Sequence, residues 1–175
     1  MERPIRSSNT LELRRDDLTG LQVRALLEEH LAEMASHTPA ESVHALPVEQ
    51  LAGPGITFWS LWSGDQLAGC GALKQLDPSH AEIKSMRTTT QFRGQGLGAE
   101  LLLRLLAEAR RLGYSRVSLE TGTNDPFIPA RRLYARHGFV ECEPFADYVL
   151  DPWSVFMTLD VSGQGEREPD TGQGT

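Results

Sequence analysis

The first half of the chain alternates between strand-like and helix-like patterns of apolar residues. Residues 10 to 15, TLELRR, alternate apolar and polar positions as a short strand does. The segment LTGLQVRALLEEHLAEMASH that follows has helical spacing, and we expect Asp16 and Asp17 to cap its N-terminus. One face of this helix carries Leu21, Ala25, Leu26, His30 and Met34. Residues 47 to 52, which Pro47 begins, predict a short second helix.

The middle of the chain predicts three consecutive antiparallel strands. ITFWSLWS and QLAGCGALKQL are apolar runs joined by the turn GD, as in a β-hairpin. DPSH then turns the chain into AEIKSMRTT, residues 81 to 89. Because short turns connect all three runs, an antiparallel sheet is the simplest arrangement.

The second half of the chain predicts one parallel strand pair. A helix follows the third run, with apolar residues at Leu101, Leu102, Leu105, Ala109 and Leu112. Because this helix intervenes, the next strand, SRVSLETG, must run parallel to its predecessor. A further helix begins near Pro129 and ends at Gly138, and FVECEPF and SVFMTLDV then close the sheet as a hairpin-like pair.

Length and composition fit a single globular domain. The chain has 175 residues, of which 39% are hydrophobic and 23% charged. We expect the domain to span residues 10 to 161, after an N-terminal extension of residues 1 to 9. Residues 162 to 175, SGQGEREPDTGQGT, contain almost nothing that can enter a core and predict a disordered tail.

Charge and residue spacing argue against several classes of partner. The net charge of -7 disfavours nucleic acid, because binding to phosphates needs a concentrated Lys/Arg surface. We find no signal peptide and no membrane span, so the expected location is the cytoplasm. Three histidines, His30, His37 and His44, are spaced seven residues apart. Because Pro39 breaks any helix between the last two, we assign no metal site.

The stretch RGQGLGAELL places three glycines just before a helix. Unpaired backbone N–H groups meet the positive end of the helix dipole there, which favours an anion. Gly94, Gly96 and Gly98 would let the backbone approach a phosphate, and Arg93 adds a guanidinium suited to phosphate oxygens. The pattern therefore predicts a site for a phosphate-bearing ligand.

Three interpretations of this loop remain beside a simple helix-capping turn. A nucleoside triphosphate loop is disfavoured, because Ala99 and Glu100 stand where Lys and Ser/Thr belong. A dinucleotide loop fits by spacing, with Glu120 near the end of the next strand as the ribose-binding acid. However, the preceding strand is polar at alternate positions, whereas a dinucleotide-binding strand is apolar throughout. The third interpretation is acyl-coenzyme A.

Two motifs together resemble the GNAT family of N-acetyltransferases. The residues Arg93 to Gly98 are similar to its coenzyme A signature, Q/R-x-x-G-x-G/A. ARRLYARHGF resembles the second signature, A-x-x-L-Y-x-x-x-G-F, from Ala130 to Phe139. The resemblance covers residues 10 to 161. It implies the acyl-CoA N-acyltransferase fold, a mixed α/β domain whose twisted, mostly antiparallel sheet has a central parallel strand pair and helices on both faces.

The resemblance implies that acetyl-CoA is bound between two splayed central strands. Backbone groups of residues 86 to 88 would pair with the pantetheine arm, and the amides of residues 95 to 99 would hold the diphosphate. Phe127 stands where many relatives have an asparagine that contacts this arm, so Asn124 or backbone groups are expected to replace it. The implied cofactor-binding residues are Met86, Arg87, Thr88, Arg93, Gly94, Gln95, Gly96, Leu97, Gly98, Ala99, Asn124, Ala130 and Tyr134.

The resemblance also implies the catalytic groups. Tyr134 matches the position that protonates the departing thiolate in many relatives. Glu82 is the first candidate for the general base, and Glu120 is the reserve candidate. Strand alternation places Glu82, Lys84, Met86 and Thr88 on one face, which supports an active-site orientation for Glu82.

The expected activity is acetyl transfer to a primary amine of a small molecule by direct attack. Glu33, His37, Glu120 and Tyr148 are predicted acceptor contacts, with Asp147 as a further option. A protein or peptide acceptor, a non-catalytic acyl-CoA-binding module and a dinucleotide-dependent oxidoreductase are the alternatives. The oligomeric state stays open, a homodimer included.

Overall fold

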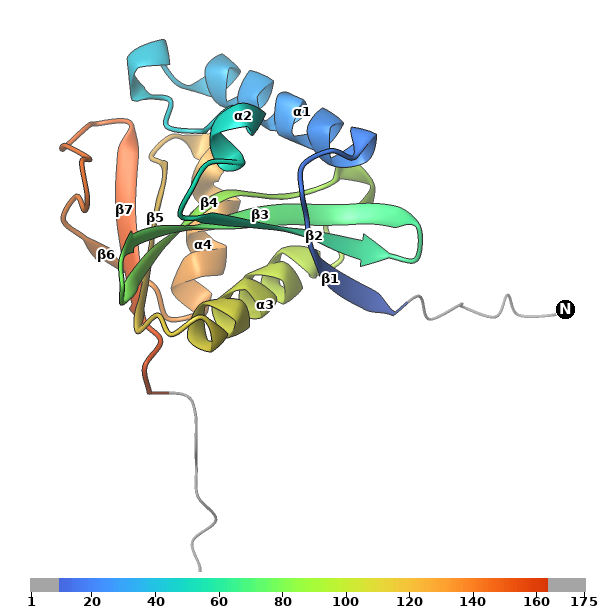
Figure 1. The fold of residues 1–175 in the computed structure, drawn as a ribbon. Coiled ribbons are helices and arrows are strands. Elements are labelled where there is room, and N and C mark those ends of the chain that lie inside the picture. The colour runs from blue at the N-terminus through green and yellow to red at the C-terminus, as the bar shows by residue number, and fades with distance from the viewer. Residues whose placement is uncertain (1–9, 164–175) are drawn as a thin grey trace, which may run out of the picture.

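A seven-stranded sheet organises residues 10–163, the part of the chain that the computed structural model describes (Figure 1). The strand order is β1-β2-β3-β4-β5-β7-β6. Neighbouring strands pair antiparallel, except that β4 and β5 are parallel. The predicted mixed α/β fold with a central parallel pair is therefore confirmed. The strands are β1 Leu11–Arg15, β2 Ile56–Ser63, β3 Gln66–Asp77, β4 His80–Thr88, β5 Arg116–Gly122, β6 Val140–Cys142 and β7 Ser154–Asp160.

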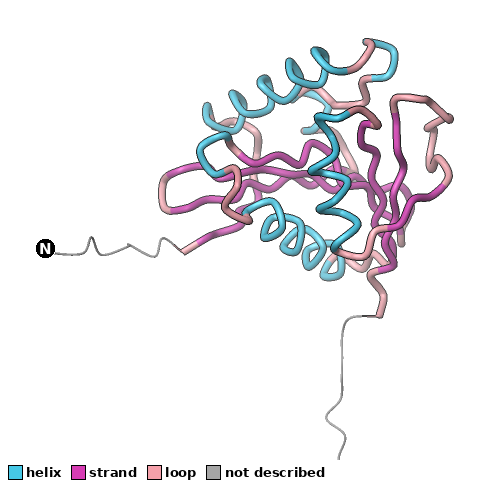
Figure 2. Tube along the Cα trace, turned by 180° about the vertical axis from the view of Figure 1, so that it is seen from behind, coloured by secondary structure: helices cyan, strands magenta, loops and turns pink. Residues whose placement is uncertain are grey.

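Helices cover both faces of the sheet, as predicted. They are α1 Leu21–His37, α2 Val48–Leu51, α3 Leu97–Arg111 and α4 Ile128–Arg136. α1 and α2 lie over one face and α3 lies against the other (Figure 1). The reverse view in Figure 2 shows α4 crossing in front of the sheet, and its Tyr134 belongs to the same buried cluster as the leucines of α3.

The described range leaves both predicted terminal segments untested. The predicted N-terminal extension, residues 1 to 9, lies outside the described residues, as does the predicted tail from residue 164 onward. The domain limits at residues 10 and 161 stay predictions. Within residues 10–163, no helix is long and apolar enough to cross a membrane.

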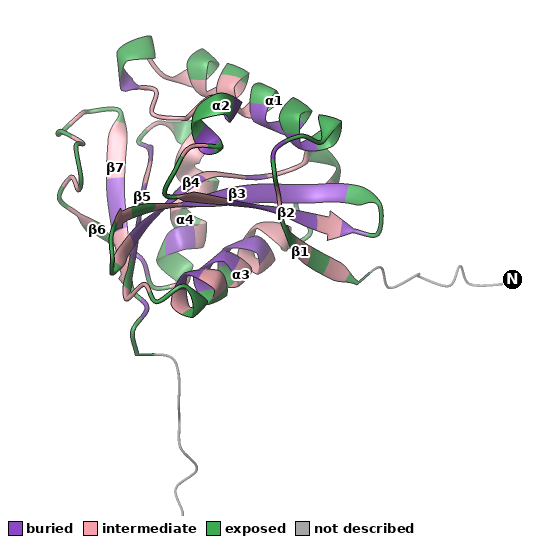
Figure 3. Ribbon diagram, in the orientation of Figure 1, coloured by how far each residue is buried: buried purple, intermediate pink, exposed green. Residues whose placement is uncertain are grey.

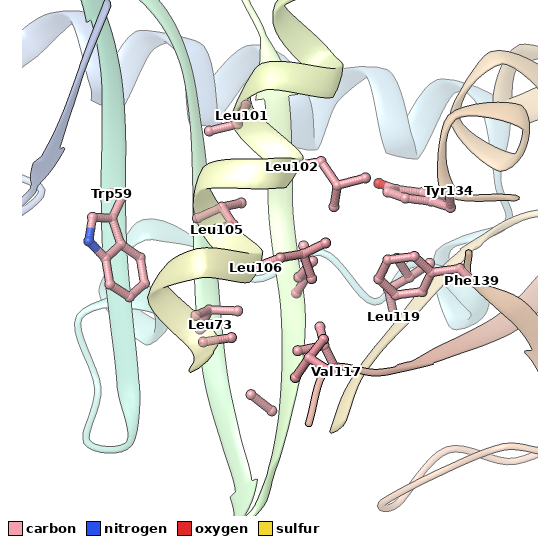
Figure 4. Packing of buried hydrophobic residues seen from close by; sticks show 14 of the residues in the cluster. Trp59, Leu73, Leu101, Leu102, Leu105, Leu106, Val117, Leu119, Tyr134 and Phe139 are labelled. Atoms are coloured by element: carbon pink, nitrogen blue, oxygen red, sulfur yellow. The ribbon is translucent and has the colours of Figure 1, made fainter. Parts of the chain in front are cut away.

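The larger of two hydrophobic cores lies between α3, α4 and the sheet. Leu101, Leu102 and Leu105 of α3 are fully buried, and Figure 4 shows them directed toward β3, β4 and the ring of Tyr134. Each buried leucine stabilises the fold by about 1.5–3 kcal/mol. The predicted apolar face of α3 is confirmed except at Leu112, which is 38% exposed because it follows the last helical turn.

Two glycines of β3 allow its neighbours to approach closely. A Cβ at Gly71 would lie 2.6 Å from Cδ1 of Leu105, and a Cβ at Gly69 would lie 2.7 Å from the carbonyl oxygen of Arg87. Gly71 therefore allows α3 to pack closely on the sheet. Gly69 allows the backbone of β4 to lie close to that of β3.

The start of α1 differs from the prediction. Gly20 is the N-cap residue, and the two aspartates instead accept hydrogen bonds in tight turns, Asp16 from the N–H of Leu18 at 2.8 Å and Asp17 from the N–H of Thr19 at 3.0 Å. α1 begins at Leu21, two residues after the second turn. The predicted apolar face of this helix is wrong at Leu21, which is 85% exposed, and at Ala25, which is also exposed. The buried residues of α1 are Val23, Leu26 and Leu27, and Figure 3 shows the opposite face exposed.

A β-bulge in β4 changes which side chains share a face. Between the pairs Cys70–Arg87 and Ala72–Lys84, β3 advances two residues while β4 advances three, and Ser85 adopts a left-handed φ of 53°. Met86 consequently packs against the core on the α3 side, whereas Arg87 reaches the carboxylates of α1. The predicted alternation that placed Met86 with Glu82 and Lys84 is wrong, because the extra residue reverses the alternation at Ser85.

We expect Leu105→Ala to lower the free energy of unfolding by about 2–5 kcal/mol, since it leaves a cavity at the centre of the larger core. Leu103→Ala is the matched control on the same helix, because Leu103 is 50% exposed; its effect should stay within about 0.5 kcal/mol. Urea denaturation followed by tryptophan fluorescence measures both. Equal losses in the two variants would contradict the assignment of this core.

Candidate active site

The central strands β4 and β5 separate after a short paired stretch. Only His80, Ala81 and Glu82 of β4 pair with β5, although β4 continues to Thr88 and β5 continues to Gly122. The facing backbone groups beyond Glu82 therefore have no partner strand. An extended ligand with amide groups could pair with them as an added strand would. This is the splay that the family resemblance implied.

A cavity of about 220 Å³ occupies this opening. α1, the segment after it, β4, β5, the loop after β5, α4 and Trp153 before β7 all contribute to its walls. Eight of the predicted site residues line it: Glu33, His37, Glu82, Met86, Arg87, Glu120, Ala130 and Tyr134. The other predicted residues are not part of the lining. Residues 93 to 99 lie at the N-terminus of α3, Thr88 ends β4, Asn124 follows β5, and Tyr148 is hydrogen-bonded to Lys84.

The glycine loop forms the start of α3. Gly94 and Gly96 have φ of 75° and 77°, a left-handed conformation that glycine adopts without strain. No protein atom lies within 4 Å of a Cβ built at either residue, so the space above this backbone is open. The first helical hydrogen bond runs from the N–H of Glu100 to Gly96, which leaves the N–H groups of residues 97 to 99 free of helical partners. Arg93 is exposed beside them, and its guanidinium lies 3.6 Å from Glu33. These groups fit a diphosphate.

A buried polar cluster lies on the α1 side of the cavity. The ammonium of Lys84 donates to Oε1 of Glu82 at 3.1 Å and to the hydroxyl of Tyr148 at 2.9 Å. Tyr148 in turn donates to the same carboxylate oxygen. Burial, followed by the negative charge of Glu82, raises the pKa of Tyr148 well above its usual range, so the phenol stays protonated. Tyr148 comes from the loop between β6 and β7 and thereby attaches this loop to β4.

Glu120 is a carboxyl group whose pKa lies near neutrality. It stands on β5 beyond the paired stretch and accepts a hydrogen bond from the hydroxyl of Ser154 at 2.9 Å. Burial raises the pKa of Glu120 to about 7, while the Ser154 hydrogen bond and the charge of Lys84 act in the opposite direction. A carboxyl group with this pKa can both take and release a proton under physiological conditions.

Tyr134 reaches the cavity from the α4 side. Its side chain is almost completely buried, and its ring packs 5.7 Å from that of Phe139. Burial and the nearby charge of Glu120 raise the pKa of Tyr134 to about 12. The phenol is therefore protonated at neutral pH, and its role as the proton donor stays a prediction.

The loop after β5 shows how the chain accommodates Phe127. A Cβ at Gly122 would lie only 2.2 Å from the ring of Phe127, so the glycine provides the room for this ring. Asn124 donates from Nδ2 to the carbonyl oxygen of His37 at 2.8 Å, and its Oδ1 is buried without a partner. Nδ2 of Asn124 thus ties the loop to the end of α1. A contact between Asn124 and the pantetheine arm stays a prediction.

Sequence reasoning missed part of the site. Arg87 was predicted for its backbone, yet its side chain pairs with Glu29 at 2.8 Å and Glu33 at 2.5 Å. His30 was placed on the apolar face of the helix, but it lines the cavity. In a regular strand, the side chains of Lys84 and Arg87 would point to opposite faces of the sheet. Two charged residues at this spacing could therefore have indicated a bulge. Residues 10–163 contain no group of three or more His, Cys, Asp or Glu side chains that could hold a metal ion.

The two faces of the sheet bring different chemistry to the opening. Glu82, Lys84 and Arg87 lie on the face that α1 covers, as does Glu120, since its neighbour Leu119 belongs to the α3 core. Tyr134 and the start of α3 belong to the α3 and α4 face, although the side chain of Arg93 approaches Glu33 of α1. The gap between β4 and β5 connects these faces. Two reactants could therefore meet in it from opposite sides.

Comparisons with known proteins agree with this geometry. Residues 22–139 match the family model described as the Acetyltransferase (GNAT) family. The chain is 55% identical over 148 residues to YsnE of Bacillus subtilis, an uncharacterised N-acetyltransferase, covering 85% of this chain and 98% of that protein. It is 47% identical to YedL of Escherichia coli, another uncharacterised N-acetyltransferase, covering 88% of this chain and 97% of that protein.

A solved structure shows the same fold. The acetyltransferase of Bacillus subtilis in complex with CoA superposes with a TM-score of 0.62 at 20% identity, covering 86% of this chain and 99% of the other. The mostly antiparallel sheet also departs from the parallel, doubly wound sheet that a dinucleotide loop requires. The chain therefore belongs to the GNAT acetyltransferase family and is an acyltransferase that depends on acetyl-CoA.

Proposed function

We propose that the chain acetylates the primary amine of a small molecule by direct attack within a ternary complex. The observation that carries this proposal is the pair of titratable groups on opposite sides of the opening, Glu120 with a pKa of about 7 and Tyr134 with a pKa of about 12. Glu120 can accept a proton at neutral pH, whereas the protonated phenol of Tyr134 can only donate one. Direct amine transfer needs both.

The residues present fit acetyl-CoA, which supplies an acetyl group activated as a thioester. Arg93 and the free N–H groups of residues 97 to 99 would hold its diphosphate. β5 pairs with β4 only as far as Glu82, so backbone groups of Met86 to Thr88 would be available to pair with the pantetheine amides. A free backbone N–H of β4 would donate to the thioester oxygen, a contribution of about 3 kcal/mol per donor in other acyl-transfer sites.

The contacts favour Glu120 over Glu82 as the general base. Oε1 of Glu82 already accepts hydrogen bonds from Lys84 and Tyr148, so this carboxylate serves mainly to position both groups. Glu120 has a single side-chain donor, Ser154, and lines the cavity. We infer that Glu120 takes the proton of the attacking amine, while Tyr134 donates its proton to the departing sulfur.

The walls of the cavity support a small acceptor over a protein segment. The hydroxyl of Ser42 donates to Asp151 at 2.6 Å, which joins the segment after α1 to the loop before β7. Asn124 makes a second connection between the loop after β5 and α1. We infer that these bridges restrict access on the α1 side, where an extended peptide would need an open groove. The cytoplasmic location and the oligomeric state stay predictions.

We expect Tyr134→Phe to lower kcat by about 10²-fold or more, because the variant lacks the proton donor but keeps the ring that packs on Phe139. The dissociation constant of coenzyme A should change less than about twofold. Thiol release from acetyl-CoA and calorimetry measure the two quantities, and Tyr114→Phe is the matched control outside the cavity. A parallel loss of turnover and coenzyme A binding would show that Tyr134 is structural.

We expect kcat/KM to fall as the pH drops through about 7, because protonated Glu120 cannot take a proton. Glu120→Gln should lower kcat/KM by about 10²–10⁴-fold and abolish this inflection, leaving only the titration of the amine itself. Glu82→Gln should retain the inflection. If the pH profile instead loses its inflection in Glu82→Gln alone, Glu82 is the base and the assignment of Glu120 is wrong.

A further inference from the structure

Three buried polar atoms without hydrogen-bond partners belong to residues that line the cavity. They are Nδ1 of His30, Oγ of Ser85 and Nε of Arg87. Among the described residues, the fourth atom of this kind is Oδ1 of Asn124, in the loop after β5. Because buried polar groups in folded proteins almost always have partners, such a group of atoms beside a cavity indicates a missing ligand. We call the three residues the polar recess.

The bulge in β4 creates this recess. Ser85 adopts a φ of 53°, a strained conformation for a residue with a Cβ, and strain of this kind is retained mainly at functional positions. Without the extra residue, regular alternation would direct Arg87 to the α3 side. With it, Arg87 lies under α1, where His30 also reaches the cavity.

The unpartnered atoms share a capacity to donate. Nε of Arg87 can only donate, the hydroxyl of Ser85 can donate, and Nδ1 of His30 donates in one neutral tautomer. A carboxylate only accepts, and its two oxygens together provide enough lone pairs for all three donors. The guanidinium of Arg87 already holds two carboxylates through Nη2, so a third acceptor can use the Nε edge.

Arg87 brings a buried positive charge to the recess, and the carboxylates of Glu29 and Glu33 pair with it. The side chain of Arg87 is 6% exposed, whereas its partners Glu29 and Glu33 are 53% and 36% exposed. Water screens the two carboxylates more strongly than it screens the buried guanidinium. Burial, followed by the positive charge of Arg87, lowers the pKa of His30 to about 4, so the imidazole is neutral at neutral pH and one of its ring nitrogens can donate.

The recess lies on the acceptor side of the opening. Arg87 shares the α1 face with Glu82 and Lys84, whereas Tyr134 belongs to the opposite face. Glu33, a partner of Arg87, also lies 3.6 Å from Arg93 beside the glycine loop. We propose that the acceptor is a primary amine that also carries a carboxylate, and that His30, Ser85 and Arg87 bind this carboxylate while Glu120 receives the amine proton. This proposal rests on the proposed function and specifies its substrate class.

The first experiment compares matched acceptors with the wild-type enzyme. Each set contains an amino acid, its primary amide and its decarboxylated amine, such as phenylalanine, phenylalaninamide and phenethylamine. Sets built on 3- and 4-carbon ω-amino acids vary the distance between amine and carboxylate. Thiol release should give a kcat/KM at least tenfold higher for the carboxylate-bearing member of one set or more, because hydrogen bonds to charged groups contribute the most.

The outcomes separate this proposal from the proposed function. If decarboxylated amines react as well as or better than the amino acids in every set, the carboxylate proposal is overturned while amine acetylation stands. If coenzyme A binds and no amine reacts, the proposed function itself fails.

A second experiment tests the recess directly. Arg87→Gln should raise the KM of the best amino acid at least tenfold, with less than a twofold change in the KM of acetyl-CoA. His30→Phe, which fills the same space without a donor, should raise the amino acid KM about threefold or more and guards against misfolding of the arginine variant. Arg93→Gln is the matched comparison, because it should raise the KM of acetyl-CoA instead.

Two results would overturn the assignment of the recess. If both recess variants change the KM of an amino acid and of its decarboxylated amine by the same factor, the recess is structural. If they raise the KM of acetyl-CoA, the recess contacts the thioester arm and not the acceptor.

Discussion

The parting of β4 and β5 is the constraint on which the rest of the molecule depends. Each strand is held from its outer side: β3 pairs with β4, and β7 pairs with β5 along its whole length from Arg116 to Gly122. The gap between them therefore persists without a ligand. It leaves two rows of backbone groups unpaired, and it connects the face under α1 with the face that carries α3 and α4 (Figure 1).

The charges in this gap are arranged by burial and by strand position. Glu82 and Glu120 come from the two facing strands, and Lys84 balances the first more directly than the second. A buried carboxyl group without a full ionic partner is easier to protonate, which is why the pKa of Glu120 rises to about 7. Tyr134 lies beyond the same gap, and the charge of Glu120 helps to keep it protonated.

Much of the fold could be predicted from sequence, because its elements have clear periodicity and its turns have typical residues. The leucines of α3, the GD hairpin and the parallel pair that a helix forces are examples. The departures have local physical causes. Asp16 and Asp17 could cap either a helix or a turn, and only the packing of Val23 and Leu26 fixes where α1 begins. The bulge at Ser85 carries no glycine or proline to mark it.

That bulge also explains why the motifs located the site but not its full chemistry. Motif residues such as Gly96 and Tyr134 act through backbone shape or a single phenol, so their positions along the chain suffice to identify them. The acceptor side instead depends on which way each residue of β4 points, and one added residue exchanges the faces of everything beyond it. Arg87 faces α1 only because Ser85 occupies a strained conformation. The acceptor specificity that we propose therefore depends on a backbone irregularity at Ser85.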